Sequence, residues 1–279
     1  MQVAILQYDA AWEDKSANHH RIEGMLRDAD PGPGAFVLLP ELCDTGFSMN
    51  LDRITGDGGR SVAWARGLAR EHGWTIQLGH AEVDPEGMGR NCATIVTPGG
   101  EAFTYQKLHP MTVLGESRAY QPGRHLLVAT LGPLTVAPLI CYDLRFPEVF
   151  RLASVAGAEL FTVGACWPVE RIEHWRALLV ARALEGQAFV LGANRTGTDP
   201  SLTYGGTSMI VSPRGEVLAE AGRTEECVLQ ATLDVADQLR FREQFPFLGD
   251  VRKELLGSVD VVRARSRTTD EASGSPPQN

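Results

Sequence analysis

The sequence lacks the features that would place the chain in a membrane or outside the cell. None of its apolar runs reaches the roughly 18–20 residues that a transmembrane helix needs. Residues 1–8 are typical of a strand and have neither the charged stretch nor the cleavage site of a secretory signal. Cysteine is scarce, and the five present are odd in number and widely scattered, which argues against a disulfide framework. We therefore expect a cytoplasmic protein.

Positive charge is also scarce. The chain has 26 lysines and arginines against 35 aspartates and glutamates, a formal net charge of −9. An acidic chain without a clustered basic face is a poor candidate for binding nucleic acid. Cys43 and Cys166 with His109 are an alternative metal site, but there is no Cys-x-x-Cys pair and no histidine spacing typical of zinc, so we predict no metal site. Because 43% of the residues are hydrophobic, the chain can build a sizeable core.

Short apolar runs alternate with longer helical patterns along the chain. This alternation, with turn sequences between some strands, predicts an α/β layer structure whose strands pair both ways under outer helices. The expected strands are Val3–Tyr8, Ala35–Leu39, Thr75–Gly79, Ala93–Thr97, Phe103–Lys107, Leu126–Ala129, Thr135–Ile140, Leu160–Val163, Phe189–Gly192, Gly206–Val211, Val217–Glu220 and Cys227–Thr232. The expected helices are Glu13–Ala29, Arg60–His72, Pro147–Ala156, Val169–Glu185 and Val235–Arg242.

No linker, repeat or low-complexity stretch divides the chain. We predict one domain over residues 1–262. Residues 263–279 contain almost no large apolar side chain and are expected to form a disordered tail.

Cys141 occupies the most suggestive position in the sequence. It lies between an apolar strand and an expected helix, where a fold can present a nucleophile and free backbone N–H groups can receive negative charge. A cysteine nucleophile needs a partner that accepts its proton. None of the seven histidines has a sequence context that points back to Cys141, so the sequence does not support a Cys–His hydrolase.

A carboxylate and an amine are better placed than the histidines. Glu41 follows an apolar strand, where a carboxylate can act as a general base. Lys107 ends another strand just before a proline loop, and a fixed ammonium there could stabilise an oxyanion. In isolation each is more often a solvated strand-end residue.

The three residues together resemble the nitrilase or carbon–nitrogen hydrolase superfamily. The motifs that carry the resemblance are Pro40-Glu41-Leu42, Tyr105-Gln-Lys107-Leu-His109 and Cys141-Tyr-Asp-Leu-Arg-Phe-Pro-Glu148, in the family's order and spacing. The resemblance covers roughly residues 1–248. It implies a four-layer αββα sandwich and cofactor-free hydrolysis of a C–N bond.

Two further segments resemble the ω-amidase branch, whose members hydrolyse the ω-amide of 2-oxo acids such as 2-oxoglutaramate. They are Ala165-Cys-Trp-Pro168, with the residues that follow it to Arg195, and Phe241-Arg-Glu-Gln-Phe-Pro246. Cys166 departs from the pattern, because asparagine is expected before Trp-Pro. The resemblance to this branch implies that the substrate is a small amide that carries a carboxylate, with ammonia as a product.

The resemblance implies a role for each site residue. Cys141 would attack the amide carbonyl and form a thioester, and Glu41 would take up and deliver the proton. Lys107 and the backbone N–H of Tyr142 would hold the oxyanion. Glu116 matches a second glutamate that this superfamily places near the lysine, and its alternative is an exposed loop acid.

The substrate contacts follow from residue type. Arg171 and Arg195 are candidates for binding a carboxylate, since a guanidinium binds it through two hydrogen bonds, and a surface ion pair is the alternative for either. Trp167 is expected in a pocket wall or the core. Arg145 is expected mainly in a structural charge cluster with Asp143, and substrate contact is its lesser alternative.

Other functions remain open. Within the class these are an N-carbamoyl amino acid hydrolase, an amidase acting on a deaminated peptide, and a nitrilase; outside it, a non-catalytic binding or assembly member of the fold. The only partners expected are a small-molecule amide and other copies of the chain, with no nucleic acid and no membrane. The resemblance implies a homodimer or higher homo-oligomer that forms through helices, and the helix around Val169–Glu185 is an expected contact.

Overall fold

Two β-sheets form the centre of the computed structural model, which describes residues 1–55 and 59–266. The first sheet has the strand order β12-β1-β2-β3-β4-β5, and the second has the order β11-β10-β9-β8-β7-β6-β13. The first is built from β1 (Gln2–Gln7), β2 (Phe36–Leu38), β3 (Thr75–Val83), β4 (Gly89–Val96), β5 (Ala102–Gln106) and β12 (Cys227–Thr232). The second is built from β6 (His125–Leu131), β7 (Leu134–Ile140), β8 (Leu160–Ala165), β9 (Phe189–Asn194), β10 (Met209–Val211), β11 (Val217–Glu220) and β13 (Asp260–Arg265).

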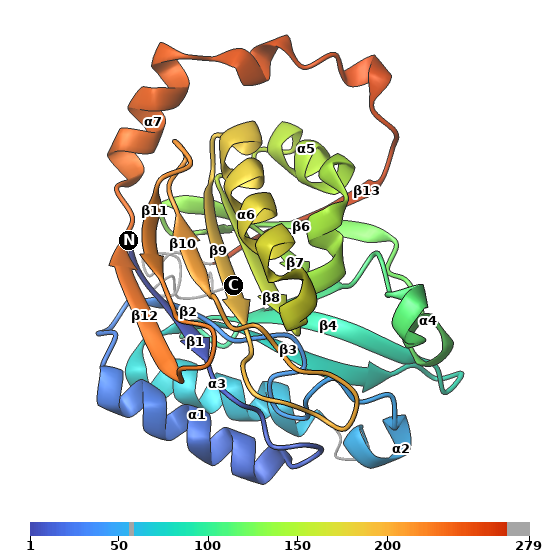
Figure 1. The fold of residues 1–279 in the computed structure, drawn as a ribbon. Coiled ribbons are helices and arrows are strands. Elements are labelled where there is room, and N and C mark those ends of the chain that lie inside the picture. Colours follow the sequence, from blue (N-terminus) through green and yellow to red (C-terminus); the bar gives the residue numbers. More distant parts are fainter. Residues whose placement is uncertain (56–58, 267–279) are drawn as a thin grey trace, which may run out of the picture.

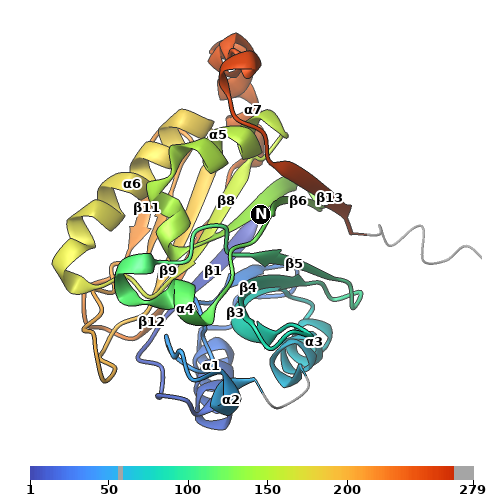
Figure 2. The ribbon, with the colours of Figure 1, turned by 90° about the vertical axis from the view of Figure 1, so that its right-hand side faces the viewer.

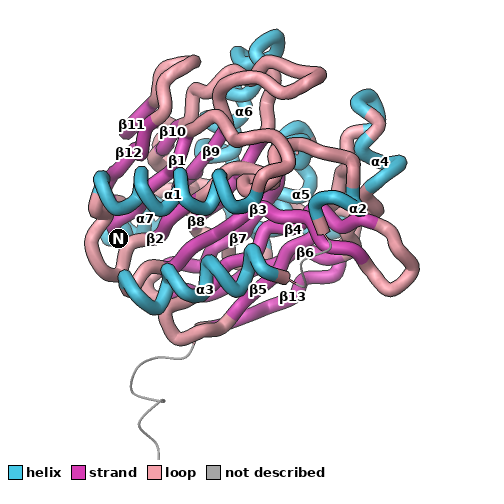
Figure 3. Tube along the Cα trace, turned by 90° about the horizontal axis from the view of Figure 1, so that it is seen from below, coloured by secondary structure: helices cyan, strands magenta, loops and turns pink. Residues whose placement is uncertain are grey.

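The sheets pack face to face, and each has helices on its outer face (Figures 1 and 2). Helices α1 (Lys15–Ala29) and α3 (Arg60–His72) lie side by side on the first sheet (Figure 3). Helices α5 (Pro147–Val155) and α6 (Ile172–Gly186) cover the second sheet. This is the four-layer αββα sandwich that the sequence predicts.

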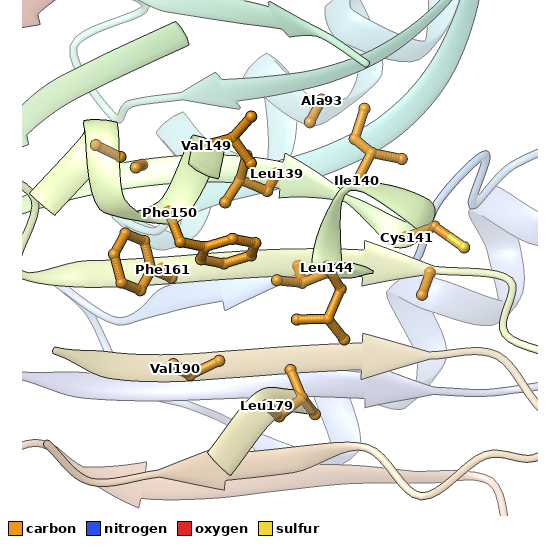
Figure 4. Close-up of a cluster of buried hydrophobic side chains, with 14 of the residues drawn as sticks. Ala93, Leu139, Ile140, Cys141, Leu144, Val149, Phe150, Phe161, Leu179 and Val190 are labelled. Atoms are coloured by element: carbon orange, nitrogen blue, oxygen red, sulfur yellow. The ribbon is translucent and has the colours of Figure 1, made fainter. Parts of the chain in front are cut away.

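The central strands are buried on both faces, which explains why they are continuously apolar rather than alternating. In β1, Val3 and Ile5 join the core between the sheets, whereas Ala4 and Leu6 pack beneath α1 and α3. A third cluster lies between the second sheet and its helices (Figure 4). The framework that carries the strand ends is therefore fixed from both sides.

Parallel pairing brings several strand ends to one edge of each sheet. Strands β1, β2 and β3 run parallel in the first sheet, and β7, β8 and β9 run parallel in the second. In parallel sheets the segments that follow the carboxyl ends lie next to one another, where open α/β sheets place their ligands. The loop after β2 and the turn after β7 leave these edges.

The remaining helical segments are short or peripheral. They are α2 (Leu51–Ile54), α4 (Glu116–Ala119), α7 (Val235–Gln244) and the 3₁₀ turns η1 (Thr112–Leu114), η2 (Cys141–Arg145), η3 (Val169–Arg171), η4 (Phe247–Asp250) and η5 (Lys253–Leu255). Within the described ranges no helix has the length and apolarity to cross a bilayer.

Strand β13 alters the expected boundary of the tail. After α7 the chain arches past α5 and α6 and returns to pair with β6 in parallel (Figure 1). The strand continues to Arg265, so residues 263–265 are ordered strand instead of the disordered tail expected from residue 263. This polar segment is held by backbone pairing with β6 and by a hydrogen bond from Arg263 Nη1 to the Ala156 carbonyl at 2.7 Å. These interactions do not require the burial of large apolar side chains. The rest of the expected tail, 267–279, lies outside the described residues.

Candidate active site

Glu41, Lys107 and Cys141 come together from three separate strand ends. Glu41 lies in the loop after β2, Lys107 follows β5, and Cys141 follows β7. Lys107 and Cys141 line a narrow cavity of about 10 Å³, together with Cys166 and Trp167. Figure 4 shows Cys141 at one end of the apolar cluster under α5, with its sulfur directed away from that cluster.

A single ammonium holds two carboxylates at the base of this site. Lys107 Nζ donates to Glu41 Oε1 at 2.7 Å and to both oxygens of Glu116 at 2.9 and 2.8 Å. Asn91 Nδ2 donates to Oε1 of the same two glutamates, at 2.8 and 2.9 Å. All four side chains are at most 1% exposed. Water therefore does little to screen their charges.

The buried charges shift two pKa values. Burial alone would lower the pKa of Lys107, but the carboxylates of Glu116 and Glu41 raise it well above its usual value. Burial raises the pKa of Glu116, and the nearby charge of Glu41 adds to this, while Lys107 opposes it. The cluster thus has one acid more than its single base, and it favours uptake of a proton.

The loop that carries Glu41 is held between the two sheets. An added Cβ at Gly79 would lie 2.5 Å from the Pro40 carbonyl oxygen and 2.7 Å from Glu41 Cα. On the opposite sheet, a Cβ at Gly164 would lie 3.1 Å from Glu41 N. Leu42 adopts a left-handed φ of 43°, which bends the chain just after the carboxylate. Close packing on both sides therefore fixes the position of Glu41.

Cys166 completes the hydrogen bonding of Glu41. Its backbone N–H donates to Glu41 Oε2 at 3.0 Å, and its thiol donates to the Glu41 carbonyl at 3.3 Å. The carboxylate oxygen that Lys107 does not contact is thus held by the main chain after β8.

Cys141 begins the turn η2 with a φ of 44°, a conformation that is strained for a residue with a side chain. Asp143 supports the turn from below. Its carboxylate accepts from Ile140 N at 3.1 Å and from the Tyr105 hydroxyl at 2.8 Å. It also accepts from His109 N at 3.0 Å and lies 2.8 Å from His109 Nδ1. Asp143 is therefore structural, as the sequence suggests.

The resting state of Cys141 is the neutral thiol. Burial raises the pKa of this thiol well above its usual value, and the negative charge of Glu41 raises it further. Lys107 and the backbone N–H of Cys166 oppose this rise without cancelling it. A base must therefore take the thiol proton during attack, and Glu41 is the carboxylate that acts on it electrostatically.

Tyr142 is the second residue of η2, so its backbone N–H has no intrahelical acceptor. Tyr142 also lines the cavity. Its N–H and the Lys107 ammonium are two donors beside the sulfur, the arrangement that stabilises an oxyanion.

Two guanidinium groups line the outer part of the cavity. The guanidinium carbon of Arg145 lies over the Trp167 ring, 4.7 Å from its centroid. Trp167 Nε1 donates to the Arg171 carbonyl at 2.8 Å. Burial lowers the pKa of Arg145, and the charge of Arg171 adds to this effect. In the described part of the chain, neither arginine forms an ion pair with a carboxylate. This cavity thus offers two cations to a ligand.

The structure brings most of the predicted site residues together. Trp167 and Arg171 line the cavity, but Arg195 does not. Its Nη2 binds Asp9 at 2.7 Å and the Ala10 carbonyl at 3.1 Å, and its guanidinium lies 4.4 Å from the Tyr204 ring. Arg195 thus forms an ion pair with Asp9 instead of lining the cavity, and its side chain is buried, whereas the expected alternative was an ion pair at the surface.

Two residues of the site gave little signal in the sequence. Asn91 lies two residues before the expected strand Ala93–Thr97, in what was expected to be a loop, and a single strand asparagine has no distinguishing pattern. Arg145 was considered mainly structural, because sequence does not show towards which side of the turn it points. Within residues 1–55 and 59–266, no group of three potential metal-binding side chains is arranged around an ion.

Comparisons with known proteins agree with this geometry. The carbon–nitrogen hydrolase family model matches residues 2–242. The chain is 34% identical over 256 residues to the 2-oxoglutaramate amidase of Bacillus subtilis, an alignment that covers 91% of this chain and 98% of that protein. It is 32% identical to the omega-amidase YafV of Escherichia coli K12, over 88% of this chain and 94% of that one.

The fold also has close counterparts among solved structures. XC1258 of Xanthomonas campestris, described as a CN-hydrolase superfamily protein with an arsenic adduct in its active site, superposes with a TM-score of 0.86. Its sequence is 30% identical, and the match covers 92% of this chain and 99% of that one.

Proposed function

The chain belongs to the carbon–nitrogen hydrolase family, whose members cleave non-peptide amide bonds through a cysteine thioester, and we propose that it is an ω-amidase. The proposed reaction releases ammonia from a small amide that also carries a carboxylate. The similarity to 2-oxoglutaramate amidase and omega-amidase along most of the chain supports this choice.

In the acylation step, Cys141 attacks the amide carbonyl carbon as Glu41 accepts the thiol proton. The carbonyl oxygen becomes an oxyanion between Lys107 Nζ and the Tyr142 N–H. The C–N bond then breaks, and Glu41 delivers its proton to the departing amine so that ammonia leaves. The acyl group remains on the Cys141 sulfur as a thioester.

In the second step, water attacks the thioester carbonyl while Glu41 accepts a water proton. The same two donors stabilise the second oxyanion. When the C–S bond breaks, the proton returns to sulfur, and the carboxylic acid is released. Glu116 positions Lys107 throughout, because both of its oxygens accept hydrogen bonds from the ammonium.

The pair Arg145 and Arg171 carries the substrate assignment. Both line the cavity that contains the Cys141 thiol, and neither is neutralised by an ion pair within the described residues. A substrate carboxylate would neutralise them through charge-assisted hydrogen bonds. A linear ω-amide has its carboxylate at the end remote from the scissile bond, as this layout requires.

Ammonia release from a panel of small compounds tests the proposal. 2-Oxoglutaramate should be hydrolysed faster than pentanamide, a five-carbon amide without the carboxylate. It should also be hydrolysed faster than N-carbamoyl amino acids and nitriles. Arg171→Gln should raise KM for 2-oxoglutaramate about 10–100-fold, the value of one or two charge-assisted hydrogen bonds. The same variant should leave pentanamide turnover nearly unchanged. Faster release from N-carbamoyl amino acids or nitriles than from 2-oxoglutaramate would replace the ω-amidase with that activity.

A further inference from the structure

The cavity contains a second thiol besides that of Cys141. Cys141 is 7% exposed and Cys166 is 3% exposed, and both line the cavity. The hydrolysis proposed above uses the backbone of Cys166 but leaves its sulfur without a function. Among the other cysteines, Cys43 and Cys92 are buried and do not line this cavity, whereas Cys227 is partly exposed.

The register of two strands places the backbones of the two cysteines close together. Cys141 follows β7 and Cys166 follows β8, which are neighbouring parallel strands with Ile140 opposite Gly164. Cys166 is therefore one residue out of register with Cys141. In extended strands, a spacing of about 4.8 Å and an offset of about 3.3 Å would place the two Cα atoms about 6 Å apart with their side chains on opposite faces. Cys141 leaves this geometry with a φ of 44°, where η2 begins. Disulfides form across Cα separations of roughly 4.4–6.8 Å.

Their hydrogen bonds also connect the two residues. The backbone N–H of Cys166 contacts the sulfur of Cys141, and it donates to Glu41 Oε2 at 3.0 Å. The Cys166 thiol donates to the Glu41 carbonyl at 3.3 Å. Both sulfurs thus lie beside the residue that is proposed to remove the proton from Cys141.

We propose that Cys141 and Cys166 form a reversible oxidation site, in which hydrogen peroxide oxidises Cys141 and Cys166 then closes a disulfide to it. The inference rests on the proposed role of Cys141 as the nucleophile. Its consequence is that an oxidant stops hydrolysis without destroying the catalytic sulfur.

The chemistry balances in two steps. The Cys141 thiolate, whose proton goes to Glu41, attacks one peroxide oxygen. A sulfenic acid forms, the O–O bond breaks, and the released hydroxide becomes water by taking a proton. The Cys166 sulfur then attacks the sulfenic sulfur, so that the S–S bond forms and the S–O bond breaks. The hydroxyl leaves as water with the Cys166 proton, and two electrons have passed from the two thiols to one peroxide.

The shape of the site favours an internal partner. Trp167, which is 2% exposed, and Arg145 line the cavity, and its volume of about 10 Å³ leaves no room for a bulky thiol such as glutathione. A neighbouring thiol needs no entry path. Without it, the sulfenic acid is open to a second peroxide and irreversible conversion to sulfinic acid.

Peptide mass spectrometry and activity after a peroxide pulse test the site in the full chain. Arg145 and Arg151 separate the two cysteines into different tryptic peptides, so a disulfide joins two peptides with the loss of two hydrogens. We expect this product in the parent protein, with hydrolysis lost as it forms and restored by dithiothreitol. Cys227→Ser should behave like the parent, because that thiol is remote from the cavity.

Cys166→Ser should lose activity under the same pulse and recover about tenfold less of its own starting activity with dithiothreitol, because Cys141 proceeds to sulfinic acid. Cys166→Asn gives the same comparison if the serine variant does not fold. A parent protein with sulfinic acid at Cys141 and a free Cys166 thiol overturns the proposal, as does equal recovery of the variant and the parent. The peptide masses need no substrate, so they test the pair even if the amide proposed above is wrong.

Discussion

At the scale of single residues, the base of the site depends on one lysine. Among the residues that the structure describes, Lys107 is the only cation that contacts Glu41 and Glu116, and these contacts are shielded from water. Removing one partner of a buried ion pair leaves an uncompensated charge, which destabilises a protein far more than the intact pair stabilises it. Lys107 should therefore be as important for folding as for the oxyanion.

We expect Lys107→Met to lower the free energy of unfolding by about 3–5 kcal/mol and to abolish measurable ammonia release. Urea unfolding at pH 7 measures the first effect. Glu116→Gln is the matched control, because Lys107 keeps Glu41 as its counter-ion and one excess acid is removed. That variant should lose activity with less than half the destabilisation. Equal destabilisation by both substitutions would contradict this view of the cluster.

The second residue prediction concerns the pH dependence of Cys141. Its raised pKa means that the thiolate fraction at neutral pH is small and grows about tenfold per pH unit until the pKa is reached. Inactivation by iodoacetamide should therefore accelerate steadily between pH 6 and pH 9. Cys227→Ser should show the same profile. A rate that is already constant below pH 7 would indicate a stable thiolate ion pair, as in Cys–His enzymes, and not the arrangement described here.

How much of the site the sequence predicts depends on where each residue lies. Glu41, Lys107 and Cys141 each follow an apolar strand, so their places at strand ends could be predicted. Their meeting could not be predicted from pairing alone, because β5 pairs antiparallel with β4 and β7 belongs to the other sheet. Asn91 and Arg145 lie within a strand and a turn, where local sequence does not determine the direction of a side chain. Arg195 follows a strand as well, but its guanidinium turns to Asp9. The position of a residue was therefore easier to predict than its orientation.

At the scale of elements, two glycines set the position of the loop after β2. Gly79 and Gly164 lie on strands of opposite sheets, and the backbone around Glu41 passes between them. Any side chain at either position would displace the loop. The expected strands ended near both glycines, but the close approach depends on how the two sheets stack, which a one-dimensional pattern does not contain.

Gly79→Ala should reduce kcat about 100-fold, the cost of displacing a catalytic group by roughly 1 Å. The added Cβ would lie within 2.7 Å of Pro40, Glu41 and Leu42 backbone atoms, none of which is a flexible side chain. Gly67→Ala is the matched control, because that exposed position in α3 has no atom within 4 Å. The control should keep full activity and gain up to about 1 kcal/mol in unfolding free energy. An unchanged kcat in Gly79→Ala would show that the loop can shift without moving Glu41.

Long periodic helices were predicted well, and short or exposed elements were not. The helix Arg60–His72 begins and ends as expected, whereas the expected helix Val169–Glu185 opens with the 3₁₀ turn η3 before α6 begins at Ile172. Helices α2 and α4 have four residues each, too few to show a helical period. Strand β13 has mostly exposed side chains and is ordered by backbone pairing, which leaves no apolar alternation in the sequence.

At the scale of the whole molecule, exposed apolar side chains gather around the C-terminal end of α6. Leu184 at this end is 48% exposed. Helix α7 packs here through Arg242, whose guanidinium donates to the carbonyls of Gln187 and Gly186 at 2.9 and 3.2 Å. Phe245 follows α7 and is 58% exposed, and its carbonyl accepts a hydrogen bond from Gln187 Nε2 at 2.8 Å. Large exposed apolar groups that lie together mark association surfaces.

The last prediction is that copies of the chain associate through this face. A homo-oligomer formed around α6 is expected from the sequence, and burial of Leu184 and Phe245 would remove their apolar surface from water. Leu184→Arg would place an unpaired charge in such an interface, so it should weaken association at least about tenfold, in the range of central interface residues. Sedimentation equilibrium over a range of concentrations measures this. Met88→Arg is the control, because Met88 is 39% exposed in the turn between β3 and β4, away from α6. A parent protein that stays monomeric at every concentration, or equal weakening by both substitutions, would show that this apolar face serves another purpose.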